Sequence, residues 1–195
     1  RRPGHAGDRH HRTGASGPLP GQRPLGPGEQ GQIVVRAPDP VMFLGYWNDP
    51  EITAEAIDAA GWMHTGDQAT IDEAGFCKIV GRIKDMVIRG GENVYPREIE
   101  EFLYRHPKIQ DVQVIGVPDE KYGEELCAWI CLKEGEQSNP EEIRAFCKGQ
   151  IAHYKIPRYV KFVDGFPMTV TGKVQKFKMR ETMISEMSLS ERETA

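Results

Sequence analysis

The sequence predicts an α+β protein whose second half is a small domain of sheet and helices. After residue 84, runs typical of buried strands and of amphipathic helices follow in the order β, α, β, β, α, β. Before residue 84 the regular stretches are mostly strands, so the two halves of the chain differ in kind. We therefore expect a sheet of three or more strands in the second half, with its helices on one face.

Composition and charge restrict the class of protein. The chain has 195 residues, of which 38% are hydrophobic and 28% charged, values that are ordinary for a globular protein. A formal net charge of −4 gives no reason to expect nucleic acid or an anionic membrane as a partner. The longest apolar run, VMFLGYW, is far shorter than the roughly twenty residues of a membrane-spanning helix. We therefore expect no nucleic-acid partner and no membrane span.

The cysteines give no sign of a metal centre or of a disulfide framework. Their spacing matches neither a zinc site nor a secreted disulfide scaffold, and three of the four lie in apolar patterns; they are Cys77, Cys127, Cys131 and Cys147. We expect reduced core residues and no metal site in this chain.

The first half of the chain contains a tail and a few regular stretches. Residues 1–28 are rich in Gly, Pro, Arg and His and show no periodicity, so we expect a disordered or non-native tail rather than a basic docking arm. Strands are expected in QIVVRAP (32–38) and CKIVGRI (77–83), with DEAG as the hairpin turn before the second. DPEITAEAI predicts a short helix, because Pro50 suits a first helical turn.

The second half begins with a short strand in DMVIR, followed by a helix from Pro96 to His106 that Pro107 stops. The acidic first turn of this helix complements the helix dipole. A second helix is expected in NPEEIRAFCKGQIAHY (139–154), opened by Asn139 and Pro140, and a terminal helix follows from about Gln175. The remaining strands are expected in DVQVIGV (111–117), ELCAWICL (125–132) and RYVKFV (158–163).

Three polar residues stand out, each with an ordinary alternative. Asp67 in HTGD follows a strand and a glycine, where its carboxylate suits a ribose diol, although a turn-forming aspartate gives the same pattern. Arg82 ends a strand and offers a planar five-donor head to a ribose or a phosphate, although a salt bridge explains it equally well. Lys173 follows Gly172 in a loop before the last helix, although most lysines in such loops only face solvent.

Longer segments of the sequence resemble one family, the adenylate-forming acyl-CoA synthetases. The resemblance covers about residues 23 to 183, through GQIVVRAPDPVMFLGYW, WMHTGD, VGRIKDMVIRGGENVYPREIE and PMTVTGK. The segments RGGENVYPREIE and HYKIPRYV resemble the corresponding segments of fatty-acyl and aryl CoA ligases, in particular those of a medium-chain fatty acyl-CoA synthetase branch. It is less similar to peptide-synthetase adenylation domains or luciferases.

The resemblance implies two half-reactions. A fatty or aryl carboxylate attacks the α-phosphate of ATP to give acyl-AMP and pyrophosphate, and the thiol of coenzyme A then displaces AMP. By position, Asp67 and Arg82 would bind the ribose hydroxyls, and Lys173 would be the catalytic cation between carboxylate and phosphate oxygens. Mg²⁺ would accompany ATP, with no ligand in this chain.

The resemblance also assigns roles to GRIKDMVIRGG. Lys84 falls at the family's hinge, about which the small domain rotates between the half-reactions. Gly90 and Gly91 would lie against the pantetheine arm of coenzyme A, where a Cβ would obstruct the thiol. These glycines do not match a Walker loop or a dinucleotide fingerprint, so a phosphate cradle is not expected.

By the same resemblance, residues 29–83 are the end of the large AMP-binding domain, residues 84–184 are the small domain, and residues 185–195 are a tail. The family's Ser/Thr/Gly-rich phosphate loop and acyl pocket do not occur in the sequence. We therefore expect a carboxy-terminal fragment that is inactive alone, whose substrate acid binds the missing upstream domain. The alternative is a noncatalytic module that binds a nucleotide or a partner protein. The sequence leaves both a cytoplasmic and a mitochondrial location open.

Overall fold

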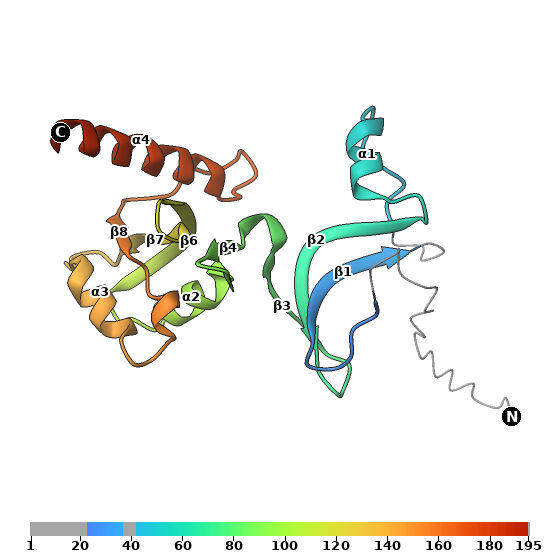
Figure 1. Ribbon diagram of the computed structural model, residues 1–195, viewed down its shortest axis with the longest axis horizontal. Helices are drawn as coiled ribbons and strands as arrows, with labels where there is room; N and C mark the ends of the chain where they lie inside the picture. Colours follow the sequence, from blue (N-terminus) through green and yellow to red (C-terminus); the bar gives the residue numbers. More distant parts are fainter. Residues whose placement is uncertain (1–22, 37–41, 195) are drawn as a thin grey trace, which may run out of the picture.

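The computed structural model describes residues 23–36 and 42–194, and only the backbone of residues 189–194. Most of the expected tail, residues 1–22, lies outside the described residues. The described elements form two separate sheets that a short segment between β3 and β4 connects (Figure 1). Of the expected tail, residues 23–28 are described, and Gly28 N–H already donates to the carbonyl of Ile71 at 2.8 Å.

The first sheet has three antiparallel strands in the order of the sequence. They are β1 (Gln30–Arg36), β2 (Trp62–Ile71) and β3 (Cys77–Arg82). The expected turn joins β2 to β3, where Asp72 Oδ1 accepts hydrogen bonds from the N–H groups of Ala74 and Phe76. The short helix α1 (Pro50–Ala56) precedes β2, and the carboxylate of Asp49 caps it by accepting from Ile52 N–H.

The second sheet has five strands. They are β4 (Val87–Arg89), β5 (Glu92–Val94), β6 (Ile109–Asp119), β7 (Gly123–Leu132) and β8 (Tyr159–Phe162). The strand order is β5-β4-β7-β6, and β8 pairs with β7 in parallel. β7 therefore lies at the centre of this sheet, and β6 pairs with it along its whole length. The sheet and its helices together confirm the α+β class predicted from the sequence.

Helices cover both faces of the second sheet, not the one face that the sequence analysis expected. The helices α2 (Pro96–Leu103) and α3 (Pro140–Cys147) bury Ile99 and Ile143 against one face. The terminal helix α4 (Lys176–Thr194) buries Met179 and Met183 against the other. The reason lies in β7, where Leu126, Ala128 and Ile130 face one layer while Cys127 and Trp129 face the other.

Two of the expected helices are shorter than predicted, and one is longer. α2 ends at Leu103 and α3 at Cys147, two residues before Gly149, whose φ of 75° suits a helix terminus. A separate 3₁₀ turn, η2 (His153–Lys155), follows. The terminal helix continues past residue 184, where Glu186 forms an ion pair with Lys161 of β8.

The two sheets meet at one close contact near their connection. The 3₁₀ turn η1 (Ile83–Asp85) links β3 to β4, and Tyr95, the residue before α2, packs against β3. A Cβ at position 81 would lie 3.3 Å from the ring of Tyr95, so Gly81 permits this approach. This junction brings the end of β3 next to the start of the second sheet (Figure 1).

Candidate functional site

Asp67 and Arg82 form an ion pair across the first sheet. They are directly opposed in the β2–β3 ladder, and Arg82 Nε donates to Asp67 Oδ1 at 3.2 Å. Arg82 is the last residue of β3, as the sequence predicted. The side chains are 67% (Arg82) and 29% (Asp67) exposed, so the pair is open to a ligand from solvent. Two residues that are 15 positions apart in the sequence thus form one exposed ion pair.

A bulge in β2 positions Asp67. Between the pairs that join β1 to His64 and to Gln68, the register shifts, and Gly66 within this stretch has a φ of 75°. Thr65 closes the bulge, because its Oγ1 donates to the carbonyl of Ile33 at 2.9 Å and accepts from Asp67 N–H at 3.1 Å. Asp67 therefore lies inside a bulged strand, so both the expectation that it follows a strand and the alternative of a turn-forming aspartate are wrong.

Lys173 lies on an exposed loop of the second domain, between β8 and α4. Gly172, with a φ of 79°, donates its N–H to the carbonyl of Thr169 at 2.9 Å, which closes a tight turn. The N–H of Lys173 donates to Thr169 Oγ1 at 3.0 Å, so the backbone of the lysine is fixed. Among the described residues none pairs with its ammonium, which leaves the cation free at the loop tip.

Lys84 is the middle residue of η1 and is exposed. The turn carries one backbone hydrogen bond of its own, from Met86 N–H to the carbonyl of Ile83 at 3.3 Å. Only this short 3₁₀ segment separates β3 of the first sheet from β4 of the second. A connection of this kind suits a hinge, because few contacts resist a change of its dihedral angles.

Gly90 and Gly91 form the turn of a hairpin that sequence reasoning missed. The strands β4 and β5 pair from Val87 with Val94 to Arg89 with Glu92, which leaves a two-residue loop. The φ angles of the two glycines are 59° and 89°, as a type I′ turn requires. Glycine is therefore needed here by the backbone itself. Gly-Gly between two short runs is a known hairpin signal, but the polar strand β5 has no apolar pattern to support it.

The turn rests on β7 through a buried ion pair and an aromatic ring. Arg89 Nη2 donates to Glu125 Oε1 at 2.6 Å, and Glu125 is only 1% exposed. The Arg89 guanidinium also lies 4.3 Å from the ring centre of Tyr122. Gly90 N–H donates to the Tyr122 carbonyl at 2.9 Å, and a Cβ at position 90 would lie 3.1 Å from its ring. At Gly91 a Cβ would meet no atom within 4 Å, so this side of the turn is open.

The structure distributes the predicted residues over both sheets. It brings Asp67 and Arg82 together on the first sheet. Lys173 and the Gly90–Gly91 turn belong to the domain around the second sheet, where they occupy separate loops. The connection at Lys84 lies between the two groups. A shared site for all of them thus depends on how the two domains are arranged.

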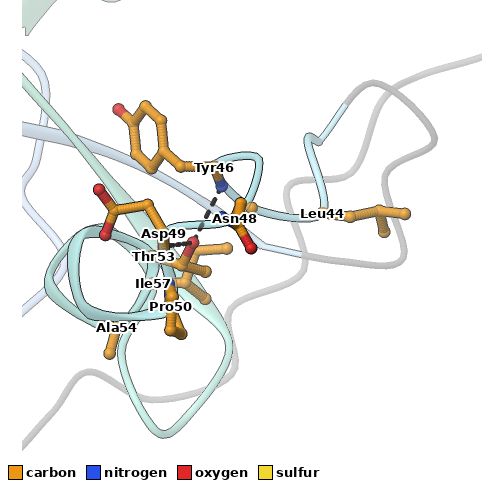
Figure 2. A pocket seen from close by; sticks show the side chains of 9 residues that line it. Leu44, Tyr46, Asn48, Asp49, Pro50, Thr53, Ala54 and Ile57 are labelled. Carbon is orange, nitrogen blue, oxygen red and sulfur yellow. Dashed lines mark hydrogen bonds between the residues drawn. The ribbon is translucent and has the colours of Figure 1, made fainter.

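A shallow hollow beside α1 is not lined by any of these residues. Figure 2 shows Tyr46, Asp49 and Thr53 gathered at the start of the helix, while Leu44 points away into solvent. Tyr46 N–H donates to Thr53 Oγ1 at 2.9 Å, and Thr53 Oγ1 donates to the Asp49 carbonyl at 2.7 Å. These hydrogen bonds join residues at the start of α1 to one another, so they stabilise that end of the helix.

Cysteine and metal chemistry have no support in the described part of the chain. All four cysteines are free, and burial raises the pKa of Cys127 to about 12 and that of Cys147 to about 11. Cys77, in contrast, is exposed instead of buried. No group of three or more His, Cys, Asp or Glu within residues 23–36 and 42–194 could hold a metal ion. No helix in that part is long and apolar enough to cross a membrane.

Comparison with known proteins identifies the class. Residues 98–173 match the AMP-binding enzyme C-terminal domain. The mitochondrial medium-chain acyl-CoA ligase ACSF2 of Pongo abelii is 59% identical over 148 residues, which cover 76% of this chain and 24% of the relative. The putative acyl-CoA synthetase YngI of Bacillus subtilis is 56% identical over 163 residues, which cover 84% and 29%. The chain belongs to the adenylate-forming acyl-CoA synthetase family, and it spans about a quarter of the length of these relatives.

Two solved structures of one protein resemble the chain to different degrees. ATP-bound MatB of Rhodopseudomonas palustris has a TM-score of 0.75 at 40% identity, covering 82% of this chain and 31% of that chain. Apo MatB of the same organism has a TM-score of 0.59 at 41% identity, covering 82% and 32%. At nearly the same identity and coverage, the chain thus superposes more closely on the ATP-bound structure than on the apo structure.

Proposed function

We propose that this chain is the carboxy-terminal part of an ATP-dependent acyl-CoA synthetase, which joins a carboxylic acid to coenzyme A through an acyl-AMP intermediate. In the first half-reaction a carboxylate oxygen attacks the α-phosphorus of ATP, and the bond to pyrophosphate breaks. In the second, the thiolate of coenzyme A attacks the acyl carbonyl, and AMP leaves with its bonding electron pair. The family and the names of the relatives support this reaction class.

The observation that carries the proposal is the open Asp67–Arg82 pair beside the inter-domain connection. The Asp67 carboxylate accepts hydrogen bonds from the two ribose hydroxyls of the nucleotide, and the Arg82 guanidinium orients the carboxylate and donates to the same ribose. Both side chains are held on adjacent strands, so a ligand meets a pre-formed pair and orders little in binding. A ribose is a better fit than a bare phosphate, because Asp67 would repel an anion.

Lys173 is the proposed catalytic residue of the first half-reaction. Its backbone is fixed by Thr169, while its ammonium has no partner among the described residues. An ammonium placed between the attacking carboxylate and the α-phosphate stabilises the charge that spreads over the phosphoryl oxygens. Mg²⁺ enters with ATP, and we assign it no ligand among the described residues.

Rotation at Lys84 is the proposed link between the half-reactions. The chain superposes more closely on ATP-bound MatB than on apo MatB, with TM-scores of 0.75 and 0.59, which supports an arrangement of its two sheets like that of the ATP-bound enzyme. We assign this arrangement to the adenylating pose, in which the Lys173 loop serves the nucleotide. Rotation about η1 then carries that loop away and presents the Gly90–Gly91 turn to the pantetheine arm, along the open side of Gly91.

A medium-chain fatty acid is the proposed substrate class, with an aryl acid as the alternative. The name of the ACSF2 relative, a medium-chain acyl-CoA ligase, supports the first. The acid binds outside the described residues, so chain length is tested with acids of several lengths. A polypeptide of these 195 residues is expected to make no acyl-CoA from ATP, coenzyme A and any of them. Production above a Lys173→Ala control would overturn that expectation.

The decisive experiment uses a chimera in which residues 23–195 replace the matching part of YngI, a relative 56% identical to this chain. Pyrophosphate release reports the first half-reaction, and thioester formation from supplied acyl-AMP reports the second. We expect Lys173→Ala to lower pyrophosphate release by about 10²–10³-fold while supplied acyl-AMP is still converted. If the chimera binds nucleotide but makes no acyl-AMP, the alternative of a noncatalytic module is correct.

A further inference from the structure

The β4–β5 hairpin is attached to its own sheet by very little strand pairing. Among the described residues, β4 and β7 share one registered pair, Arg89 with Gly123, whereas β6 pairs with β7 along its whole length. In a two-residue hairpin the closing pair, here Arg89 with Glu92, faces inward. The alternation of an antiparallel ladder then turns the N–H of Ile88 away from β5, toward the side of β7.

Glu124 of β7 accepts the hydrogen bond from that N–H. Its Oε2 accepts from Ile88 N at 2.8 Å, and its Oε1 accepts from Arg180 Nη1 of α4 at 2.7 Å. Arg180 also donates to the carbonyl of Gly116 at 3.0 Å. A Cβ at position 116 would lie 3.2 Å from Glu124 Oε1 and 3.0 Å from Val87 Cγ2, so glycine leaves room for the carboxylate. One side chain thus joins the hairpin to the sheet and to the helix.

The geometry points to Glu124 as a positioning residue for the Gly90–Gly91 turn in the thioester-forming half-reaction. Ile88 is two residues before Gly90, so its N–H fixes the strand that carries the turn. The inference rests on the proposed function, because that function assigns the turn to the pantetheine arm. A loose turn would leave the thiol misaligned with the acyl carbonyl, and small displacements are costly in such attacks.

The same geometry separates two roles of Glu124. Holding the hairpin requires the bond to Ile88 N–H, whereas docking α4 requires the bond to Arg180. Of these two bonds Arg180→Met removes only the second, together with the bond from Arg180 to the Gly116 carbonyl. Glu124→Ala removes both, and Glu124→Gln keeps an amide oxygen that can accept from Ile88 N–H. If Glu124 positions the hairpin, alanine is harmful, glutamine restores the function, and Arg180→Met is mild.

The first test measures amide hydrogen exchange on the 195-residue chain, without any substrate. We expect Glu124→Ala to speed exchange at Ile88 and Gly90, whose N–H groups are hydrogen-bonded, by about tenfold or more, because a charge-assisted hydrogen bond is lost. Glu124→Gln and Arg180→Met should leave these amides close to the unsubstituted chain. Equal acceleration by Glu124→Ala and Arg180→Met would overturn the inference, because the carboxylate would then act through the helix.

The second test measures the two half-reactions in the YngI chimera. We expect Glu124→Ala to slow thioester formation from supplied acyl-AMP by about tenfold, with pyrophosphate release changed less than about twofold. Glu124→Gln should restore the thioester rate. Equal loss in both steps, or no rescue by glutamine, would overturn the inference. If the unsubstituted chimera makes no acyl-AMP, the proposed function has failed instead, and the exchange experiment still decides whether Glu124 holds the hairpin.

Discussion

The two sheets of this chain differ sharply in how well they bury their apolar side chains. In the first, Ala69 is the only described hydrophobic residue that is buried, while Phe76 is 75% exposed and Trp47, before α1, is 98% exposed. In the second, two clusters of buried side chains fill both faces of β6 and β7. The second sheet therefore has a core of its own, and the first exposes apolar surface that we expect further protein to cover.

This difference in burial accompanies a difference in the candidate functional residues that each sheet carries. The exposed sheet carries the Asp67–Arg82 pair, for which we propose a ligand that arrives from solvent. The well-packed second sheet and its helices carry the Lys173 loop and the Gly90–Gly91 turn, which the proposed rotation would move together as a rigid body.

The largest effect should be on local stability of the 195-residue chain. We expect amides of β1–β3 to exchange about a hundredfold or more faster than those of β6 and β7, because few buried contacts oppose opening of the first sheet. Limited trypsin digestion should correspondingly leave a resistant core that begins near residue 85. Equal protection of both sheets would show that the first is stable without further covering.

The next effect concerns the buried ion pair under the hairpin. Glu125→Ala should cost about 3–5 kcal/mol in the free energy of unfolding of the second domain, because Arg89 is left buried without its partner. The control is Asp67→Ala, which removes the carboxylate of the exposed pair in the first sheet and should cost less than about 1 kcal/mol. Urea denaturation followed by circular dichroism measures both. Similar losses in the free energy of unfolding for the two variants would contradict the contrast between the two sheets.

A matched pair of apolar truncations gives a somewhat smaller difference. Leu126→Ala in β7 should cost about 2–5 kcal/mol, because it leaves a cavity in a core where Leu126 is fully buried. Ile79→Ala in β3 should change the free energy of unfolding by no more than about 0.5 kcal/mol, because Ile79 is largely exposed. The same urea experiment compares them, and a large effect of Ile79→Ala would mean that the first sheet packs more firmly than its exposure indicates.

The smallest effect is a pH dependence of the second domain through His106. Burial lowers the pKa of this imidazole, against the opposing effect of Glu142 and with a contribution from Lys108 and Lys133. Folding thus favours the neutral ring, so stability is complete above the unfolded pKa of about 6.5 and falls as the pH drops through it. Urea denaturation at pH 7.5 and 5.5 should show a smaller pH effect in His106→Gln than in the unsubstituted chain. An identical pH effect in both would contradict the prediction.

Much of the fold could be predicted because its signals are local. The caps of α1 and α3 are read directly from Asp49 and Asn139, each followed by proline. The nearly continuous apolar runs of β6 and β7 indicated buried strands, and they also contained the sign that both faces are covered. The expectation of helices on one face was wrong because it rested only on the order of the elements. It did not consider which helix would cover the second apolar face of β7.

The sequence named the residues of the candidate site one by one, but not how they are arranged in space. Sequence reasoning selected Asp67 and Arg82 separately, and only the β2–β3 register shows that they meet. It missed the β4–β5 hairpin, because Glu92, Asn93 and Val94 are too few and too polar for a strand pattern. It also missed Glu124, since a glutamate that accepts from a backbone N–H 36 residues away leaves no local signal.

The sequence by itself determined the family, the α+β class and the residue types that suit nucleotide chemistry, because these depend on local order and spacing. Only the tertiary structure decided which residues pair, which side of Gly91 is open, and that the Glu124 carboxylate accepts a hydrogen bond from the backbone of the β4–β5 hairpin. The physical reason is that hydrogen bonds and burial depend on distances between atoms, and strand register brings together residues that the linear sequence keeps far apart.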